Sequence, residues 1–258
     1  MSIPWLKSDT PLPPTSHALD ASSQAPGLLA AGGGLAVARL RDAYARGVFP
    51  WYSPGQPVLW WSPDPRMLLR TAEFRLSHSL RKTLRRFLRT PGCAIRFDYD
   101  PGEVMRQCAQ VPRDGQFGTW IVPEMQEAYA DWVGHGDVHS VETWVGGRLV
   151  GGLYCVNLGH MVFGESMFSR RTDASKMALA ALVGFCRLHE MPLIDCQQAT
   201  NHLASLGAAP RPRAEFEREI QPLLARLPAP LWAYDPKIWE TLSVWGPSGA
   251  PTPADDRP

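Results

Sequence analysis

Alternating apolar and polar positions predict a group of short β-strands in the middle of the chain. The segments VHSVETWV, RLVGGLYCV and MVFGESMF are rich in β-branched and aromatic residues. Gly146-Gly147 separates the first two segments, and Gly159-His160 separates the second from the third. Tight turns of this kind join antiparallel neighbours. We therefore expect a three-stranded antiparallel meander.

Helical periodicity follows the meander. A one-sided apolar stripe, which begins near Asp173 and Ser175, predicts a helix and consists of Leu179, Leu182, Val183 and Cys186. The segment MPLIDCQ then predicts a short buried strand, and a second amphipathic helix is expected from Phe216 to Leu227. Three antiparallel strands, a helix, a strand and a helix give the α+β order of an acetyltransferase-like (GNAT-like) acyl-transfer fold.

The N-terminal part differs in composition. A helix is expected over residues 35–45, and the proline- and aromatic-rich segment GVFPWYSPGQPVLWWSPDPR follows it. Such a segment folds only by packing against another part of the chain. We expect a small N-terminal α/β domain over residues 27–72 beside a catalytic domain over residues 73–246. Residues 1–26 and 247–258 lack periodicity and are expected to be disordered.

The charge distribution is uneven. The 258 residues carry a net charge of only +1, but residues 66–89 contain eight basic residues and one acid. Within this block, SHSLRKTLRRFLR predicts an amphipathic helix that Ser77 or Ser79 can cap. Its polar face carries Arg81, Lys82, Arg85, Arg86 and Arg89, without the acids that would form ion pairs along the helix. This pattern favours a polyanionic partner, although a solvated helix face is the alternative.

Composition argues against a globally disordered chain, a membrane-spanning protein, a disulfide framework and a metal site. Hydrophobic residues make up 45% of the chain, enough for a core, and no apolar run is long enough to span a membrane. The five cysteines form no C-x-x-C pair, which argues against a disulfide framework or a zinc site and favours the reduced cytoplasm. His135 and His139 are four residues apart, but the intervening Gly-Asp-Val does not favour a helix, so no metal site is expected.

The connection after the third strand bears on the acyl donor. Acetyltransferase-like folds usually bind coenzyme A through a glycine-rich turn between the fourth strand and the next helix, where backbone N–H groups hold the pyrophosphate. The corresponding segment here, SRRTDASK, contains no glycine. An acyl donor carried on another polyanion is therefore favoured over coenzyme A.

Several motifs, in order along the chain, resemble the leucyl/phenylalanyl-tRNA–protein transferase family. They are GLLAAGG, GVFPWYSPGQPVLWWSPDPR, GTWI, HSVETW, GESMFS, ASK, LIDCQ and HLASLGA. The resemblance runs from about Gly27 to Leu227. It implies transfer of Leu or Phe, with Met as a further candidate, from aminoacyl-tRNA to the α-amino group of proteins that begin with Arg or Lys. The product would carry a destabilising N-terminus for protein degradation. We expect a cytoplasmic monomer that uses no cofactor.

The resemblance and strand geometry together suggest catalytic residues. Alternation in Ile194-Asp195-Cys196-Gln197 would place Asp195 and Gln197 on one face and Cys196 on the other. We expect Asp195 and Gln197 to hold and deprotonate the incoming amine, directly or by relay, and Glu165 to orient the acceptor's basic residue. Turn capping is the alternative for Asp195. Cys196 is expected to be a core thiol.

By resemblance, an apolar socket would select Leu or Phe. Its candidate lining residues are Leu153, Val162, Met167, Leu182 and Ile194. The family also implies that Trp120 stacks on the terminal adenosine, and the basic helix is the candidate tRNA-binding surface. Ordinary core packing is the alternative for the socket residues and for Trp120. Two other functions remain open at this point: a non-catalytic tRNA-binding module and a coenzyme A-dependent acetyltransferase.

Overall fold

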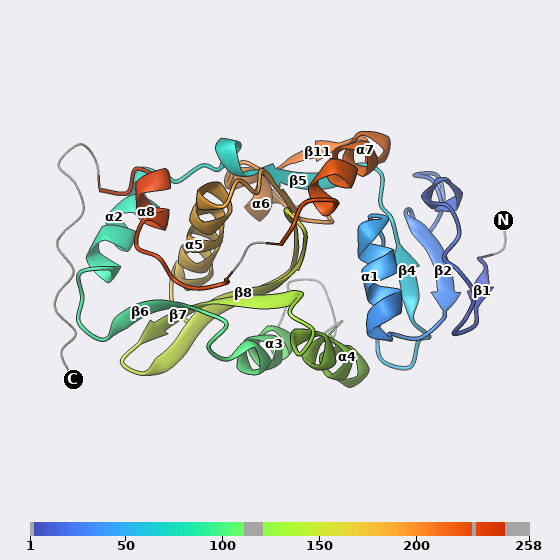
Figure 1. Cartoon of the computed structure of the whole chain (residues 1–258), viewed down its shortest axis with the longest axis horizontal. Coiled ribbons are helices and arrows are strands. Elements are labelled where there is room, and N and C mark those ends of the chain that lie inside the picture. Colours follow the sequence, from blue (N-terminus) through green and yellow to red (C-terminus); the bar gives the residue numbers. More distant parts are fainter. Residues whose placement is uncertain (1–2, 111–120, 229–230, 246–258) are drawn as a thin grey trace.

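The structure is a computed structural model that describes residues 3–110, 121–228 and 231–245 (Figure 1). These residues form two sheets. The smaller sheet has the order β1-β2-β4-β3 and contains β1 (Trp5–Leu6), β2 (Leu28–Gly32), β3 (Phe49–Pro50) and β4 (Leu59–Trp61). The larger has the order β11-β5-β10-β9-β8-β7-β6 and contains β5 (Arg66–Arg70), β6 (Cys93–Phe97), β7 (Val138–Val145), β8 (Arg148–Leu158), β9 (Met161–Ser169), β10 (Leu193–Asp195) and β11 (Ala209–Arg211).

Helices pack beside both sheets. They are α1 (Val37–Ala45), α2 (His78–Phe87), α3 (Pro101–Gln110), α4 (Pro123–Val133), α5 (Ala174–Leu188), α6 (Asn201–Ser205), α7 (Arg213–Leu224) and α8 (Ile238–Thr241). Short 3-10 turns cover Thr15–His17 and Thr71–Glu73. The chain is thus a mixed α+β protein, as the pattern predicted.

The predicted meander is confirmed. β7, β8 and β9 pair antiparallel in sequence order. At the first turn, Gly146 and Gly147 have φ of +57° and +72°, a left-handed conformation that glycine adopts without steric cost. The chain then crosses through α5 and returns as β10, which is parallel to β9. The helices expected before and after this unit are α1, α2, α5 and α7.

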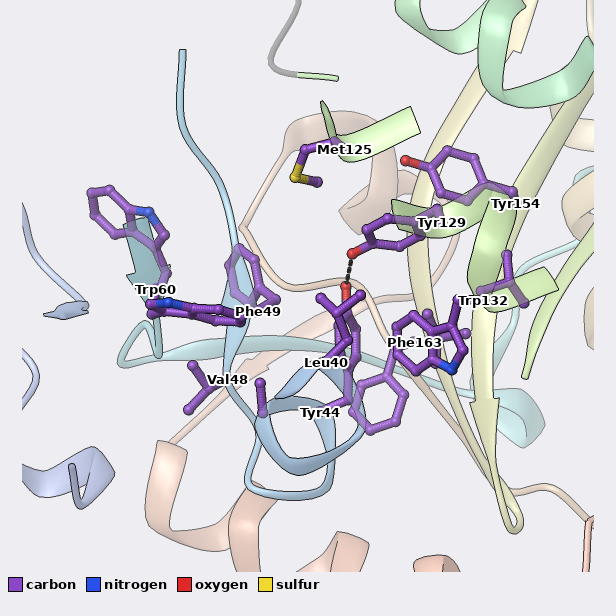
Figure 2. Close-up of a cluster of buried hydrophobic side chains, with 14 of the residues drawn as sticks. Leu40, Tyr44, Val48, Phe49, Trp60, Met125, Tyr129, Trp132, Tyr154 and Phe163 are labelled. Atoms are coloured by element: carbon purple, nitrogen blue, oxygen red, sulfur yellow. Dashed lines mark hydrogen bonds between the residues drawn. The ribbon is translucent and has the colours of Figure 1, made fainter. Parts of the chain in front are cut away.

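The larger sheet separates two cores. Side chains alternate along β8, so that Leu153 and Cys155 join the core under α5, whereas Tyr154 and Val156 join the core under α3 and α4. The N-terminal part contributes to this second core. Figure 2 shows Tyr44 of α1 beside Tyr129 and Trp132 of α4 and Phe163 of β9.

The N-terminal boundaries differ from the expectation. Residues 3–26 are not a disordered extension: β1 pairs parallel with β2, and Leu6 and Leu12 are buried. Arginine side chains partner the proline-rich backbone, because Arg46 donates to the carbonyls of Leu12 and Pro13. The expected domain limit at residue 72 is also too late, since β5 lies within the larger sheet between β10 and β11. The predicted C-terminal tail lies outside the described residues.

Residues 231–245 pack across the α5 side of the larger sheet; we call this segment the C-terminal strap. Trp232 stacks on His139 with ring centroids 4.0 Å apart. Ile238 lies against Gly184 of α5, where a Cβ would be 2.6 Å from the Ile238 carbonyl oxygen. Only glycine permits this close approach of strap and helix.

Candidate active site

A pocket opens where β10 stops and β9 continues. β10 pairs with β9 only over Met161–Phe163, whereas β9 extends to Ser169. Beyond the paired part lies an open pocket of about 570 Å³. Its lining includes Phe49, Trp51, Leu153, Tyr154, Gly164, Glu165, Ser166, Met167, Leu179, Leu182, Ile194, Cys196, Gln197, Gln198, Thr200, His202 and Leu203.

One side of the pocket is polar. Gln197 Nε2 donates to Glu165 Oε1 at 3.0 Å, so these two predicted residues lie together. The Tyr44 hydroxyl donates to the same oxygen at 2.7 Å, and the Tyr129 hydroxyl lies 3.4 Å from Oε2. The two tyrosine hydroxyls are also hydrogen-bonded to each other (Figure 2). Helices α1 and α4 therefore hold the carboxyl group that β9 presents to the pocket.

Burial dominates the electrostatics of Glu165. It raises the pKa of this carboxyl from 4.5 to about 8, and the charge on Asp195 acts in the same direction. The hydrogen bonds from Tyr44 and Tyr129 oppose this effect only in part. Burial and the Glu165 charge also raise the pKa of both tyrosines, so their hydroxyls stay protonated. Near neutral pH the site thus contains a carboxyl that can exchange a proton.

Asp195 lies away from the pocket lining. Its two carboxylate oxygens accept hydrogen bonds from Arg66 Nε and Nη2 at 2.8 and 2.6 Å, and both residues are fully buried. The expected alternation therefore does not hold: Ile194, Cys196 and Gln197 line the pocket, and Asp195 does not. The reason is local, because β10 ends at Asp195 and Gln197 has φ of +60°, which breaks the period of two.

Other residues of the pocket lining are apolar. Leu153, Met167, Leu182 and Ile194 line it, as predicted for the socket. Val162 is absent from the lining; it is fully buried in the core under α5, two residues before the pocket begins on β9. Trp120 lies outside the described residues.

Cys196 lines the pocket and also packs against the core under α5, where its thiol was expected. Burial, together with the charge of Asp195, raises its pKa far above the usual range. Since the thiolate is the nucleophilic form, this cysteine is a poor nucleophile at neutral pH.

The basic residues of α2 divide into two groups. Arg81 and Arg85 face the C-terminal strap and donate to the carbonyls of Ser243 and Val244, the second at 2.5 Å. Lys82 and Arg86 are exposed on the neighbouring stripe. Arg89 is exposed too, with its guanidinium 5.4 Å from the centroid of the Trp245 ring. The predicted N-cap is Ser77, which accepts a hydrogen bond from the Leu80 N–H.

Several lining residues were not predicted. Phe49 and Trp51 come from the N-terminal part, Leu179 from α5, and Thr200, His202 and Leu203 from the start of α6. A signal for α6 was present: Thr200 caps it by accepting a hydrogen bond from the Leu203 N–H, a role for which threonine is favoured. Burial lowers the pKa of His202, and the charge of Lys176 lowers it further, so this imidazole is neutral at pH 7.

The described residues contain no group of three or more His, Cys, Asp or Glu side chains arranged to hold a metal ion. His139 pairs with Asp98 at 2.7 Å, and His135 bonds to the Asp131 carbonyl, so the two histidines have separate partners. Among the described helices, none combines the length and apolar character that crossing a membrane requires.

The chain matches two models of one protein family. Residues 68–221 match the family model for leucyl/phenylalanyl-tRNA protein transferase, and residues 33–64 match the model for its N-terminal domain. The match to the N-terminal family model ends at residue 64 and the other match begins at residue 68, so the boundary falls at the start of β5.

Similar proteins cover nearly the whole chain. A leucyl/phenylalanyl-tRNA–protein transferase of Leptothrix cholodnii is 60% identical over 98% of this chain and 99% of that protein. Its counterpart in Methylibium petroleiphilum is 61% identical over 93% and 91%, and that in Burkholderia pseudomallei is 53% identical over 98% of each. The chain therefore belongs to the leucyl/phenylalanyl-tRNA–protein transferase family.

Proposed function

We propose that this protein transfers Leu or Phe, with Met as a further candidate, from aminoacyl-tRNA to the α-amino group of proteins that begin with Arg or Lys. The product would be a protein with a destabilising N-terminus. The observation that carries the proposal is the pocket itself. It combines an apolar lining, suited to a Leu or Phe side chain, with the polar pair Glu165 and Gln197.

The reaction needs little activation. The amine nitrogen forms a peptide bond to the ester carbonyl carbon as the bond to the tRNA ribose oxygen breaks; the amine loses a proton and the ribose oxygen gains one. An α-amino group has a pKa of about 7.7–8.0, so a fraction is already neutral at pH 7. The pocket must therefore position the amine, remove a proton and stabilise the oxyanion, and none of these steps requires a cofactor.

Within the polar pair, Gln197 would hold the incoming amine. Glu165 is the only carboxyl that lines the pocket among the described residues. A cation that enters beside it would favour the ionised carboxylate. This is the chemistry expected for a basic acceptor residue, and it supports Arg or Lys at the acceptor's N-terminus.

The direct test is incubation of the protein with labelled leucyl-tRNA and a peptide that begins with Arg. Label on the peptide supports the proposal. The matched peptide with an acetylated N-terminus should remain unlabelled, because its nitrogen can no longer attack the ester. Absence of label on either peptide, with intact leucyl-tRNA, would reject the proposed activity.

The apolar side of the pocket makes a prediction about selectivity. Met167→Ala should lower kcat/KM for leucyl and phenylalanyl transfer about tenfold, because a missing methylene costs about 1 kcal/mol or more of binding. Met177→Ala is the matched control: Met177 belongs to α5 and is buried in the core, but it does not line the pocket. It should lower stability without changing transfer. Normal transfer by Met167→Ala would show that Met167 does not contribute to the socket for the transferred side chain.

We also propose that the exposed basic residues Lys82 and Arg86 of α2, together with Arg89 just after the helix, contact the tRNA backbone. Lys82 and Arg86 are one turn apart and lie on one side of α2. Arg89 lies two residues beyond the end of the helix, where its guanidinium packs against the Trp245 ring of the strap. Arg81 and Arg85, which the sequence grouped with them, are engaged by the strap.

Two matched double variants test this division. Lys82→Gln/Arg86→Gln should weaken tRNA binding and lower the salt slope by about 2, because each duplex phosphate contact contributes about 0.9. Its melting temperature should not change. Arg81→Gln/Arg85→Gln removes the same charge but should lower the melting temperature, since the strap loses its donors. Filter binding over a salt series and thermal melts would measure both effects. Unchanged tRNA affinity in the first variant would contradict the assignment.

The order of the elements supports an acetyltransferase-like (GNAT-like) fold of the catalytic part. Antiparallel β7–β9, the crossing helix α5 and the parallel strand β10 occur in the order expected for such a fold, and the pocket lies where β9 and β10 part. The five cysteines are free thiols, which favours a reducing compartment such as the cytoplasm. We further propose that the protein acts as a monomer.

A further inference from the structure

A buried ion pair lies behind the pocket. Arg66 is 1% exposed and Asp195 is fully buried, and neither lines the pocket. Within the described part of the chain, Nη1 of Arg66 has no hydrogen-bond partner. Desolvating two charges is costly, and an unpartnered donor adds to that cost. Stability alone therefore does not explain the pair.

The guanidinium of Arg66 is held from two sides. Its central carbon lies 4.8 Å from the ring centroid of Phe49 and 4.8 Å from that of Phe216. Phe49 comes from β3 and also lines the pocket, whereas Phe216 comes from α7. The planar group is thus fixed by the N-terminal part and by the last long helix together.

The carboxylate of Asp195 acts on the backbone that follows it. Its Oδ1, which accepts from Arg66, also accepts from the Gln197 N–H at 2.8 Å. Gln197 has φ of +60°, a conformation that costs a non-glycine residue free energy unless its surroundings hold it. The Gln197 carbonyl accepts from the Met67 N–H at 3.2 Å, which ties the same residue to β5.

We infer that the Arg66–Asp195 pair holds Gln197 in its left-handed turn, and that this turn aims the Gln197 amide at Glu165 and the pocket. Asp195 and Arg66 are then positioning residues, and the carboxylate of Asp195 does not take the amine's proton. This inference rests on the proposed function, because the amine is the substrate of that reaction.

A double variant distinguishes a positioning role of Asp195 from a role as the base that takes the amine's proton. Asp195→Asn keeps an oxygen for the Gln197 N–H but leaves Arg66 as a buried, unpaired charge. We expect kcat/KM for peptide labelling to fall about a hundredfold, the effect that a misplacement of about 1 Å can have. Arg66→Met/Asp195→Asn removes the unpaired charge as well. It should recover activity to within about tenfold of wild type, with the pH–rate profile unchanged in shape.

The matched control removes the neighbouring pair on the same strand. Arg70 donates to both carboxylate oxygens of Glu219 in a partly buried ion pair. Arg70→Met/Glu219→Gln should keep wild-type activity, because this pair does not contact the turn at Gln197.

The inference is overturned if the folded double variant is as inactive as Asp195→Asn, which would require a carboxylate at position 195, or if Asp195→Asn alone is fully active. If the double variant does not fold, Arg66→Lys tests the positioning role instead. Lysine keeps the positive charge but lacks the planar guanidinium that binds both carboxylate oxygens, so kcat should fall about tenfold with KM for the peptide unchanged. Wild-type kcat in that variant would also overturn the inference. An inactive wild-type protein would reject the proposed function instead.

Discussion

Replacement of Gln197 by glycine should lower leucyl transfer to an Arg-initiated peptide by about 10²–10³-fold, the usual cost of removing one preorganised hydrogen-bonding group from an active site. The amide of Gln197 lines the pocket and donates to Glu165, so its loss removes the group proposed to hold the amine. Glycine is the informative replacement, because it adopts the left-handed backbone of residue 197 without strain. The fold of the turn is thus retained while the side chain is removed.

Single-turnover labelling measures this effect, and two further variants separate its causes. Gln197→Ala also lacks the amide but strains the turn, so it should be as inactive as Gln197→Gly and less stable. Gln221→Ala is the matched control, since this exposed amide on α7 bonds only to the Ala45 carbonyl among the described residues. It should transfer normally. Normal transfer by Gln197→Gly would show that the amide takes no part in the reaction.

Regular periodicity made the central elements predictable. The three strands of the meander and helix α5 bury long apolar stripes, and such stripes are set by local spacing. The same is true of α2, whose apolar face and serine cap are both visible in the sequence. The expected disorder does not hold for residues 3–26, and composition could not show that Arg46 and Arg39 would donate to carbonyls of this proline-rich segment.

The site was predictable only in part, because its geometry depends on contacts between distant residues. Glu165 and Gln197 were both expected at the catalytic site, and a hydrogen bond joins their side chains. The placement of Asp195 could not be foreseen, since Arg66 lies 129 residues earlier in the chain and no local pattern links them. Likewise, Phe49 and Trp51 reach the pocket from the N-terminal part, and their sequence showed only that they had to pack on something.

Glu165 should make the stability of the protein depend on pH. Its pKa is raised from 4.5 in the unfolded chain to about 8 in the folded protein, so the folded state binds this proton more tightly. The resulting stabilisation is fully present below pH 4.5 and is lost as the pH rises through about 8. At about 1.4 kcal/mol per pKa unit, the upper limit of the loss is about 5 kcal/mol.

Glu165→Gln isolates this contribution, because glutamine keeps the shape and the hydrogen-bonding capacity of a neutral carboxyl but cannot ionise. Urea unfolding at pH 5.5, 7 and 8.5 should show wild type losing free energy of unfolding relative to Glu165→Gln as the pH rises. Glu127→Gln, the same change at an exposed residue of α4, is the control and should show no such trend relative to wild type.

Parallel curves of unfolding free energy against pH for wild type and Glu165→Gln would mean that Glu165 is ionised in the folded protein at all three pH values. Glu165 would then meet a basic acceptor as a preformed carboxylate. If the difference in free energy of unfolding between Glu165→Gln and wild type instead rises with pH, the folded carboxyl is protonated at the lower pH values. The cationic acceptor and a proton then compete for this carboxyl, and the acceptor's KM should fall between pH 6 and pH 8 as the carboxyl ionises.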